Sequence, residues 1–386
     1  MISSLSNGTR PLKALFCFGT RPELIKVAPL IRGFGTHGIT PVVVNTGQHS
    51  DLLTPLFDLF QVKPDHDLAV MTQGQTLNGL AAKLMERLDP VLVEERPDVV
   101  LVQGDTASAL AGAQAAFNRQ IPVGHIEAGL RSGNMMSPFP EEMNRRLITQ
   151  MASLNFAATE FNRQTLLSEG VAEAAIHLTG NPVVDALHWT LKHVKPGDAF
   201  HDLHARVAGR KMVIVTTHRR ENFGETMRMN LRALRRFAAR HPELCIVFPV
   251  HPNPNVREAV AAELLGCESI LMCHPLGYAD FAHLLSKAWL MVSDSGGIQE
   301  EAATLGKPIL VLRANTERPE GVTAGVARLA GEHPERLEQM LEDAVQDEAW
   351  FEMASSSRAV FGDGTATEKT ARALLELFPR TQQLAA

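Results

Sequence analysis

Two successive series of apolar runs constrain the fold of this chain most strongly. Each run is long enough for one strand, ends in a polar or glycine-rich cluster, and precedes a segment with helical periodicity. Runs of the first series lie at residues 12–18, 41–46, 98–103 and 121–126, and the second series begins at Lys211. Strands that alternate with helices form parallel sheets. The sequence therefore predicts an α/β protein with two Rossmann-like domains that face each other across a cleft.

The length of 386 residues exceeds what one hydrophobic core usually organises, so two main domains are expected. The polar segment 195–209 shows no clear periodicity and is interpreted as an irregular linker. The predicted parts are a disordered extension at 1–10, an N-terminal domain at 11–190, a nucleotide-binding C-terminal domain at 191–366, and a last helix at 367–386 that packs back on the N-terminal domain.

The composition is that of an ordinary globular protein, with 45% hydrophobic and 21% charged residues. A net charge of −6 argues against nucleic acid as a partner, because nucleic-acid binders usually carry a basic patch. No apolar run approaches the ~20 residues of a membrane span, and residues 1–10 are polar, unlike a signal peptide. The four scattered cysteines are typical of reduced thiols, which predicts a cytoplasmic protein.

The segment 289–301 has the pattern of a strand, a tight turn and a helix, with Asp-Ser-Gly-Gly at the turn. Ser295 is expected to cap the helix, and Gly296 and Gly297 leave its first N–H groups without a covering Cβ. These donors and the helix dipole favour a phosphate or diphosphate. Glu301 lies one turn further on the same side, within reach of a ribose hydroxyl. An ordinary βα turn is the alternative interpretation.

Neither a nicotinamide cofactor nor a metal is indicated. Residues 33–38 match G-x-G-x-x-G, but the motif follows a helix and precedes a strand, the reverse of the dinucleotide fingerprint. It is interpreted as a helix stop. The pair His201 and His204 lacks further ligands at metal-binding spacing. We therefore expect no cofactor and no metal.

Charged side chains follow several strands of the first series, where ligands of doubly wound sheets bind. Arg21 follows the first strand at a turn typical of an anion contact, whereas Lys26 has the alternative of a solvated helix lysine. Asp105 either caps the next helix or presents its carboxylate to the same crevice. Glu127 ends a buried strand and is followed by Ala128 and Gly129 instead of a helix start, and a purely structural role explains this position less well.

Three further clusters carry candidate groups. Residues 137–146 lead from a proline-rich loop into a helix, where Glu141 and Arg145 have the i,i+4 spacing of a plain surface ion pair. Residues 218–224 follow a strand of the second series and form the densest polar cluster of the chain, and residues 251–255 follow another strand. The sequence thus predicts polar groups at strand ends in both domains.

Taken together, these motifs resemble the non-hydrolysing UDP-N-acetylglucosamine 2-epimerases from about residue 12 to the last helix. The resemblance rests on residues 18–23, 104–106, 125–131, 218–221, 294–301 and 317–320. It implies the GT-B type fold, a homodimer, and interconversion of UDP-N-acetylglucosamine and UDP-N-acetylmannosamine for cell-surface polysaccharide synthesis, without cofactor or essential metal.

The resemblance also implies a role for each matching residue. Catalytic groups around the sugar would be Asp105, Glu127, Glu141 and His218. Substrate contacts would be Arg21, Lys26, Arg145, Phe281, Ser295, Gly296, Gly297, Glu301 and Arg318. A second UDP-N-acetylglucosamine molecule activates bacterial members, through residues that match Gln48, His49, Arg219 and His251. The segment 73–75 lacks an arginine that some members bring to this second site.

The chemistry of the reaction is consistent with several carboxylates. The C2 proton of an N-acetylhexosamine is not acidic, so loss of UDP from C1 is expected first, followed by proton exchange on both faces of C2 through a 2-acetamidoglucal. Asp105 and Glu141 are the expected C2 acid–base groups, with Glu127 stabilising positive charge and His218 donating to the departing diphosphate. Which carboxylate serves which face stays open at this point.

Four alternatives are weighed against this hypothesis. A GT-B glycosyltransferase would need an acceptor pocket and usually a single base, and a nucleotide-sugar sensor would need no convergent carboxylates. A hydrolysing relative differs only in its products, and another 2-acetamido sugar nucleotide could be the substrate.

Overall fold

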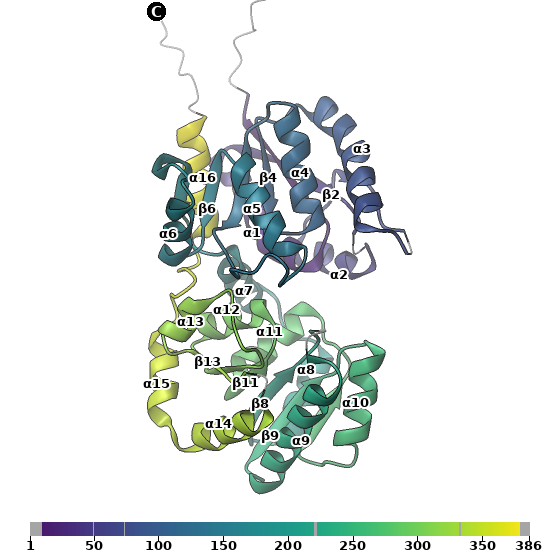
Figure 1. Cartoon of the computed structure of the whole chain (residues 1–386), viewed down its shortest axis with the longest axis vertical. Helices are drawn as coiled ribbons and strands as arrows, with labels where there is room; N and C mark the ends of the chain where they lie inside the picture. Colours follow the sequence, from purple (N-terminus) through teal and green to yellow (C-terminus); the bar gives the residue numbers. More distant parts are fainter. Residues whose placement is uncertain (1–9, 49, 73, 220–221, 332, 379–386) are drawn as a thin grey trace, which may run out of the picture. The chain divides into compact units, whose positions relative to one another are not determined.

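The computed structural model describes residues 10–48, 50–72, 74–219, 222–331 and 333–378, so most of the predicted extension lies outside it. The chain forms two compact units (Figure 1). The N-terminal unit ends at Asp185 and resumes at Gly364, and the C-terminal unit is Ala186–Asp363. The last helix therefore belongs to the N-terminal unit.

The N-terminal unit contains a seven-stranded parallel sheet in the order β3-β2-β1-β4-β5-β6-β7. Its strands are β1 (Leu12–Phe18), β2 (Ile39–Asn45), β3 (His66–Asp67), β4 (Val99–Gln103), β5 (Val123–Ala128), β6 (Leu154–Ala157) and β7 (Ile176–Leu178). All residues of β4 and β5 are buried, because helices cover both faces of the sheet.

Two layers of helices enclose this sheet (Figure 1). Helices α3 (Leu77–Glu95), α4 (Ala107–Asn118) and α5 (Glu141–Met151) pack side by side, and α6 (Glu160–Ser168) packs on β7. The other layer has α1 (Arg21–Phe34) between α2 (Ser50–Phe60) and α16 (Ala366–Leu377). Gly38 adopts a left-handed φ of 70° after α1, which confirms that the glycine-rich segment is a helix stop.

The C-terminal unit contains a six-stranded parallel sheet in the order β10-β9-β8-β11-β12-β13. Its strands are β8 (Lys211–Thr216), β9 (Leu244–Pro249), β10 (Ile270–Cys273), β11 (Leu290–Ser293), β12 (Ile309–Val311) and β13 (Ala327–Leu329). Its helices are α8 (Asp198–Val207), α9 (Glu225–Arg240), α10 (Pro254–Leu264), α11 (Tyr278–Lys287), α12 (Gly296–Leu305), α13 (Pro319–Thr323), α14 (Pro334–Gln346) and α15 (Glu348–Ser356), with α7 (Pro182–His193) leading into the unit.

The two parallel sheets confirm the predicted α/β class with two Rossmann-like domains. The predicted irregular linker at 195–209 is wrong, because α8 occupies most of it. Phe200, Leu203 and Val207 are buried at helical spacing, and the polar residues among them hid this period. Strands β3, β7 and β13 are too short to give a sequence signal. Among the described residues, no helix has the length and apolar character needed to cross a bilayer.

Two contacts hold α16 on the N-terminal unit: hydrogen bonds to Asp185 and close packing against α1. Asp185 accepts hydrogen bonds from the backbone N–H groups of Ala366 (3.2 Å) and Thr367 (3.0 Å) and from the Thr367 hydroxyl (2.9 Å). The methyl group of Thr367 then faces Gly33 of α1. A Cβ built on Gly33 would lie 2.5 Å from Thr367 Cγ2, whereas one built on Gly35 would meet nothing within 4 Å.

This contact predicts opposite effects of two glycine substitutions. Gly33→Ala should lower the free energy of unfolding by about 1–3 kcal/mol because the added methyl overpacks the contact. Gly35→Ala should raise it by about 0.5–1 kcal/mol, since alanine restricts the unfolded chain. Urea denaturation followed by circular dichroism measures both changes. Thr367→Ser keeps the hydroxyl and removes the methyl, so it should rescue Gly33→Ala, and failure of this rescue would contradict the assigned contact.

Candidate active site

A turn that carries the carboxylate of Asp105 follows β4. Thr106, not Asp105, is the N-cap of α4, and its hydroxyl accepts a hydrogen bond from the Ala109 N–H (3.0 Å). The capping interpretation of Asp105 is therefore wrong. Gly104 adopts a φ of 68°, which turns the chain so that Asp105 leaves the strand end.

Arg145 of α5 holds this carboxylate. Its Nε and Nη2 lie 2.8 and 2.7 Å from Asp105 Oδ2, and Asn144 donates to the Asp105 carbonyl (2.7 Å). Arg145 also pairs with the fully buried Glu142 (3.0 Å). The interpretation of Glu141 and Arg145 as a plain surface ion pair is thus wrong, because Arg145 is buried and points to other carboxylates.

The environment of Asp105 suits proton transfer. Burial raises the pKa of Asp105 above its ordinary value, the Arg145 guanidinium opposes this rise, and the nearby Glu127 carboxylate adds to it. The net direction is upward. Asp105 therefore holds a proton more readily than an ordinary aspartate does.

Glu127 lies in β5 and is surrounded by donors. It adopts a φ of 64°, and the register of β5 with β6 shifts between Ile126 and Ala128. This irregularity turns its side chain toward Lys26 and Gln103, and Asn181 donates to Oε1 (3.0 Å). Three donors on one carboxylate favour its ionised form. Lys26 is buried and pairs with Glu127, so the alternative of a solvated helix lysine is wrong.

Two charged side chains of this unit stand at helix starts. Arg21 is the first residue of α1, and Glu141 is the first residue of α5; both are half-buried. Neither side chain forms a hydrogen bond or ion pair with another described residue. Both side chains are therefore available to a ligand.

His218 and Asp294 form the corresponding centre of the C-terminal unit. His218 follows β8, and its Nδ1 lies 3.1 Å from Oδ1 of Asp294, which follows β11. Asp294 is fully buried, whereas the His218 side chain is 43% exposed. The ring of His251, after β9, stacks on His218 with centroids 5.7 Å apart.

The turn after β11 begins α12 as predicted, but its cap differs. Ser295 occupies the N-cap position without a side-chain capping hydrogen bond, so the expected cap by its hydroxyl is wrong. Instead, Ser293 Oγ accepts the Ser295 N–H (3.0 Å) and fixes the turn. A Cβ on Gly296 would overlap the guanidinium of Arg318, whereas one on Gly297 would meet nothing within 4 Å. Gly296 thus admits Arg318, and Gly297 keeps the helix start open.

Arg318 is anchored beside this helix start. Its Nε donates to Glu300 Oε1 (2.7 Å), and its exposed fraction is 8%. Glu301, the next residue of α12, is also buried. Phe281 is half-buried in the first turns of α11. A fixed guanidinium and an open helix N-terminus are together suited to a diphosphate.

The residues expected at a second ligand site are divided between the units. Gln48 accepts a hydrogen bond from Ser108 (3.0 Å) in the N-terminal unit. Arg219 lies 3.7 Å from Glu317, and His251 Nδ1 accepts the Asn253 N–H (3.2 Å), in the C-terminal unit. His49 lies outside the described residues.

Three buried carboxylates were missed as site residues. Glu23 accepts the N–H groups of Gly19 (3.1 Å) and Thr20 (2.8 Å) and the hydroxyl of Thr106 (2.8 Å), and burial raises the pKa of Glu23 to about 7. The capping-box pattern of Thr20 and Glu23 could have revealed it. The i,i+3 and i,i+4 spacing of Glu142 to Arg145 and Arg146 was a local signal for Glu142. Asp294 gave no such signal, because its partners lie in the loop after β8.

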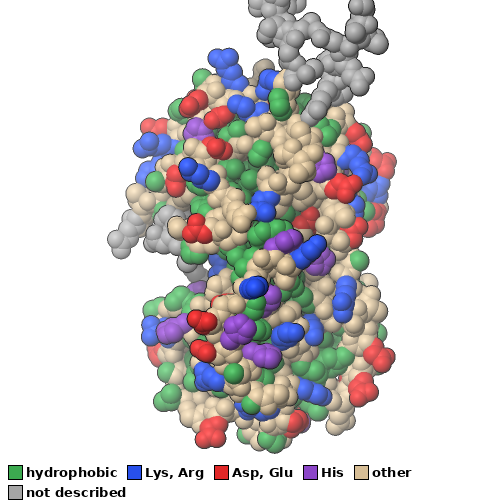
Figure 2. All heavy atoms as spheres, turned by 180° about the vertical axis from the view of Figure 1, so that it is seen from behind, with side chains coloured by type: hydrophobic (Ala, Val, Ile, Leu, Met, Phe, Trp, Pro, Cys, Tyr) green, Lys and Arg blue, Asp and Glu red, His purple; other side chains and the backbone are tan. Residues whose placement is uncertain are grey.

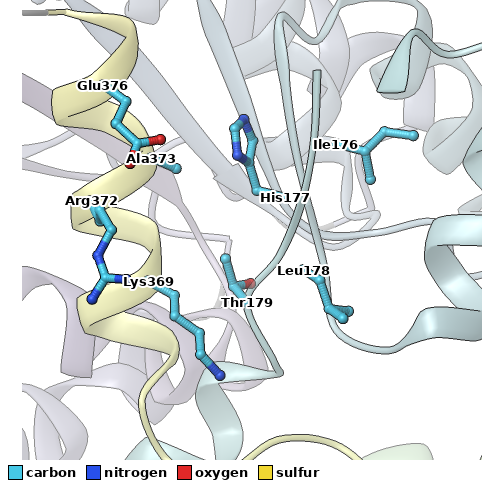
Figure 3. Close-up of a pocket in the computed structure, with 8 residues that line it drawn as sticks. All are labelled: Ile176, His177, Leu178, Thr179, Lys369, Arg372, Ala373 and Glu376. Atoms are coloured by element: carbon cyan, nitrogen blue, oxygen red, sulfur yellow. The ribbon is translucent and has the colours of Figure 1, made fainter. Parts of the chain in front are cut away.

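A pocket of about 290 Å³ lies elsewhere in the N-terminal unit, where α16 covers β7 (Figure 3). Its lining contains none of the predicted site residues, so it is not the candidate active site. Histidines gather on one face of the C-terminal unit (Figure 2). Within the described ranges, however, no three His, Cys, Asp or Glu side chains are placed to hold a metal ion. His201 and His204 contact the Phe200 ring.

Comparison with known proteins identifies the family. A family model described as UDP-N-acetylglucosamine 2-epimerase matches residues 35–375. The chain is 44% identical over 369 residues to the UDP-N-acetylglucosamine 2-epimerase of Escherichia coli K12, covering 94% of this chain and 98% of that protein.

Solved structures agree with the sequence comparison. The UDP-GlcNAc 2-epimerase of Neisseria meningitidis bound to UDP-GlcNAc has a TM-score of 0.89 at 39% identity, covering 95% of this chain and 100% of that one. The Methanocaldococcus jannaschii enzyme in complex with UDP-GlcNAc and UDP has a TM-score of 0.78 at 33% identity, covering 95% and 99%. The chain therefore belongs to the UDP-N-acetylglucosamine 2-epimerase family.

Proposed function

We propose that the protein interconverts UDP-N-acetylglucosamine and UDP-N-acetylmannosamine by inverting C2, as an isomerase. The observation that carries this proposal is the group of carboxylates at the ends of β4 and β5 and the start of α5. Asp105 and Glu127 are close enough for their charges to interact, and Glu141 begins the helix that also supplies Arg145. A reaction that exchanges a proton on both faces of one carbon needs more than one such group.

The proposed reaction begins with loss of UDP. The C1–O bond breaks and its electron pair leaves with the diphosphate, which gives C1 an oxocarbenium-like character that acidifies the C2 proton. A carboxylate removes this proton to form 2-acetamidoglucal. A second group then delivers a proton to the opposite face of C2 as the diphosphate adds back to C1.

The contacts favour different tasks for the three carboxylates. Glu127 accepts from Lys26, Gln103 and Asn181, which suits a permanent anion that stabilises the positive sugar. Asp105, whose pKa is raised, and Glu141, without a partner among the described residues, are suited to carry protons.

The C-terminal unit would hold the nucleotide. The open helix start at Gly297 and the anchored Arg318 suit the diphosphate, and we assign Glu301 to the ribose and Phe281 to the uracil. His218 would donate to the departing diphosphate, and Arg21 and Lys26 of the N-terminal unit complete the charged set. A single-base glycosyltransferase would not need this number of carboxylates.

Solvent deuterium tests the reaction. Purified protein incubated with UDP-N-acetylglucosamine in D2O should form UDP-N-acetylmannosamine that carries deuterium at C2, without added cofactor. Proton NMR and mass spectrometry of the nucleotide sugars measure both the product and the label. Conversion that needs NAD, or a product without deuterium, would contradict the elimination mechanism. Irreversible release of UDP would instead indicate a hydrolysing enzyme.

A second prediction separates chemistry from nucleotide binding. Glu141→Gln should lower kcat by about 10²–10⁴-fold, because a general acid–base group is lost, and leave the UDP Kd unchanged. Glu141 is the sharpest choice, since replacing Asp105 or Glu127 also removes the ion pair of a buried cation. Glu160→Gln is the matched control, because Glu160 likewise begins a helix of the same unit. Glu301→Ala should weaken UDP binding instead, and similar behaviour of these variants would contradict the division.

We further propose that a second UDP-N-acetylglucosamine molecule activates the enzyme at Gln48, His49, Arg219 and His251. If this second molecule binds the active conformation more tightly than the inactive one, the rate should depend sigmoidally on UDP-N-acetylglucosamine concentration. The reverse reaction, from UDP-N-acetylmannosamine, should then need traces of UDP-N-acetylglucosamine. Gln48→Ala should abolish the sigmoidicity without weakening UDP binding. Gln48 is a cleaner target than His251, whose ring touches His218. His274→Ala, at an exposed histidine after β10, is the control. Hyperbolic kinetics of the parent protein would show that this switch is absent.

Homodimer formation, the cytoplasmic location and the supply of polysaccharide synthesis stay predictions.

A further inference from the structure

We propose that Asp294 is a positioning residue, which holds His218 through Nδ1 and thereby fixes the ring tautomer that presents Nε2 to the substrate. The substrate contact of His218 rests on the proposed function, whereas the tautomer itself does not. The contact that carries the inference joins Asp294 Oδ1 to His218 Nδ1 at 3.1 Å. No sequence motif paired these residues, which lie 76 positions apart.

The carboxylate of Asp294 is surrounded by donors. Its Oδ2 accepts from the Thr217 hydroxyl (2.8 Å), the His218 N–H (2.9 Å), the Arg219 N–H (3.0 Å) and the Asn222 side-chain amide (3.0 Å). Its Oδ1 is left to the ring of His218 and a longer contact with the His218 N–H (3.2 Å). Thr217, His218, Arg219 and Asn222 of the segment after β8 are therefore all held at the end of β11.

This set of donors keeps Asp294 ionised. Burial by itself would raise the pKa of Asp294, but the side chain of His218 and the N–H groups of Arg219 and His218 hold it well below its usual range. An ionised carboxylate only accepts hydrogen bonds. The His218 nitrogen that faces it must consequently carry the hydrogen.

The consequence for His218 follows from the two ring nitrogens. With hydrogen fixed on Nδ1, neutral His218 presents a lone pair at Nε2, and the protonated ring presents an N–H there. A proton passing to or from His218 therefore moves through Nε2 in both directions of the reaction. Asp294 is also the residue before Ser295, so its contact with His218 connects that ring to the turn proposed for the diphosphate.

Asp294→Asn tests this role because the surroundings determine how the amide must sit. Its oxygen has to occupy the Oδ2 position, where four donors converge, so its NH₂ group faces His218 Nδ1. A donor at that place forces Nδ1 to accept and moves the hydrogen to Nε2. The reversed tautomer should lower kcat by about 10²–10⁴-fold, the contribution of a general acid–base group. The corresponding change in a Ser-His-Asp enzyme costs about 10⁴-fold. The UDP Kd should change by less than about threefold.

Nitrogen-15 NMR of the histidine side chains in the full chain measures the tautomer. The His218 signal is assigned by its absence in His218→Gln. We expect the Nδ1–H form in the parent protein and the Nε2–H form in Asp294→Asn. Asp185→Asn is the matched control, because Asp185 is also a buried aspartate that gathers backbone N–H groups but faces no histidine. It should change neither the His218 signal nor kcat.

An Nε2–H tautomer in the parent protein would overturn the proposal, and this measurement does not depend on any variant folding. An unchanged tautomer in Asp294→Asn, or a loss of UDP affinity as large as the loss of kcat, would overturn it as well. A parent protein without epimerase activity would instead refute the proposed function and leave the tautomer result standing.

Discussion

Both units depend on the hydrogen bonds and ion pairs that stabilise buried carboxylates at the ends of parallel strands. A charge buried without partners costs several kcal/mol, so each such carboxylate requires donors from neighbouring elements. Glu127 draws its donors from α1, β4 and the start of α7, and Asp294 draws its donors from the loop after β8. These requirements fix the loops at the strand ends, where the fold offers little regular backbone bonding.

A second class of polar groups in the same regions is left without such compensation. Glu141 and Arg21 begin helices and have no partners among the described residues, and the Ser295 hydroxyl does not cap its own helix. Several donors hold the carboxylates of Glu127 and Asp294 in place, whereas Glu141 and Arg21 are available to a ligand. In the proposed function, Glu127 and Asp294 supply fixed charge and Glu141 takes part in the reaction itself, and fixed charges of this kind provide electrostatic preorganisation.

The sequence predicted the elements well and the side-chain pairings poorly, for a physical reason. Apolar runs and glycine-rich turns are local signals, and they placed Glu127, Asp294 and the turn before α12 at strand ends. The pairings depend on tertiary distance: Lys26 and Glu127 are 101 positions apart, and no local pattern joins them. Spacing along the helix also predicted the wrong ion pair for Arg145, because Asp105 and Glu142 are its partners and Glu141 is not. Helix α8 was missed because its three core contacts are separated by histidines and other polar residues.

The sources of the donors have a consequence for how such a site is built. All donors described above for Glu127 belong to the N-terminal unit, and all those for Asp294 belong to the C-terminal unit. Glu127 and His218 of the proposed site are therefore each oriented by contacts within their own unit, so that less side-chain ordering is left for ligand binding. Much of the entropic cost of ordering these side chains is then part of folding and not of binding. Binding energy can instead stabilise the distorted, charge-separated sugar that the proposed elimination requires.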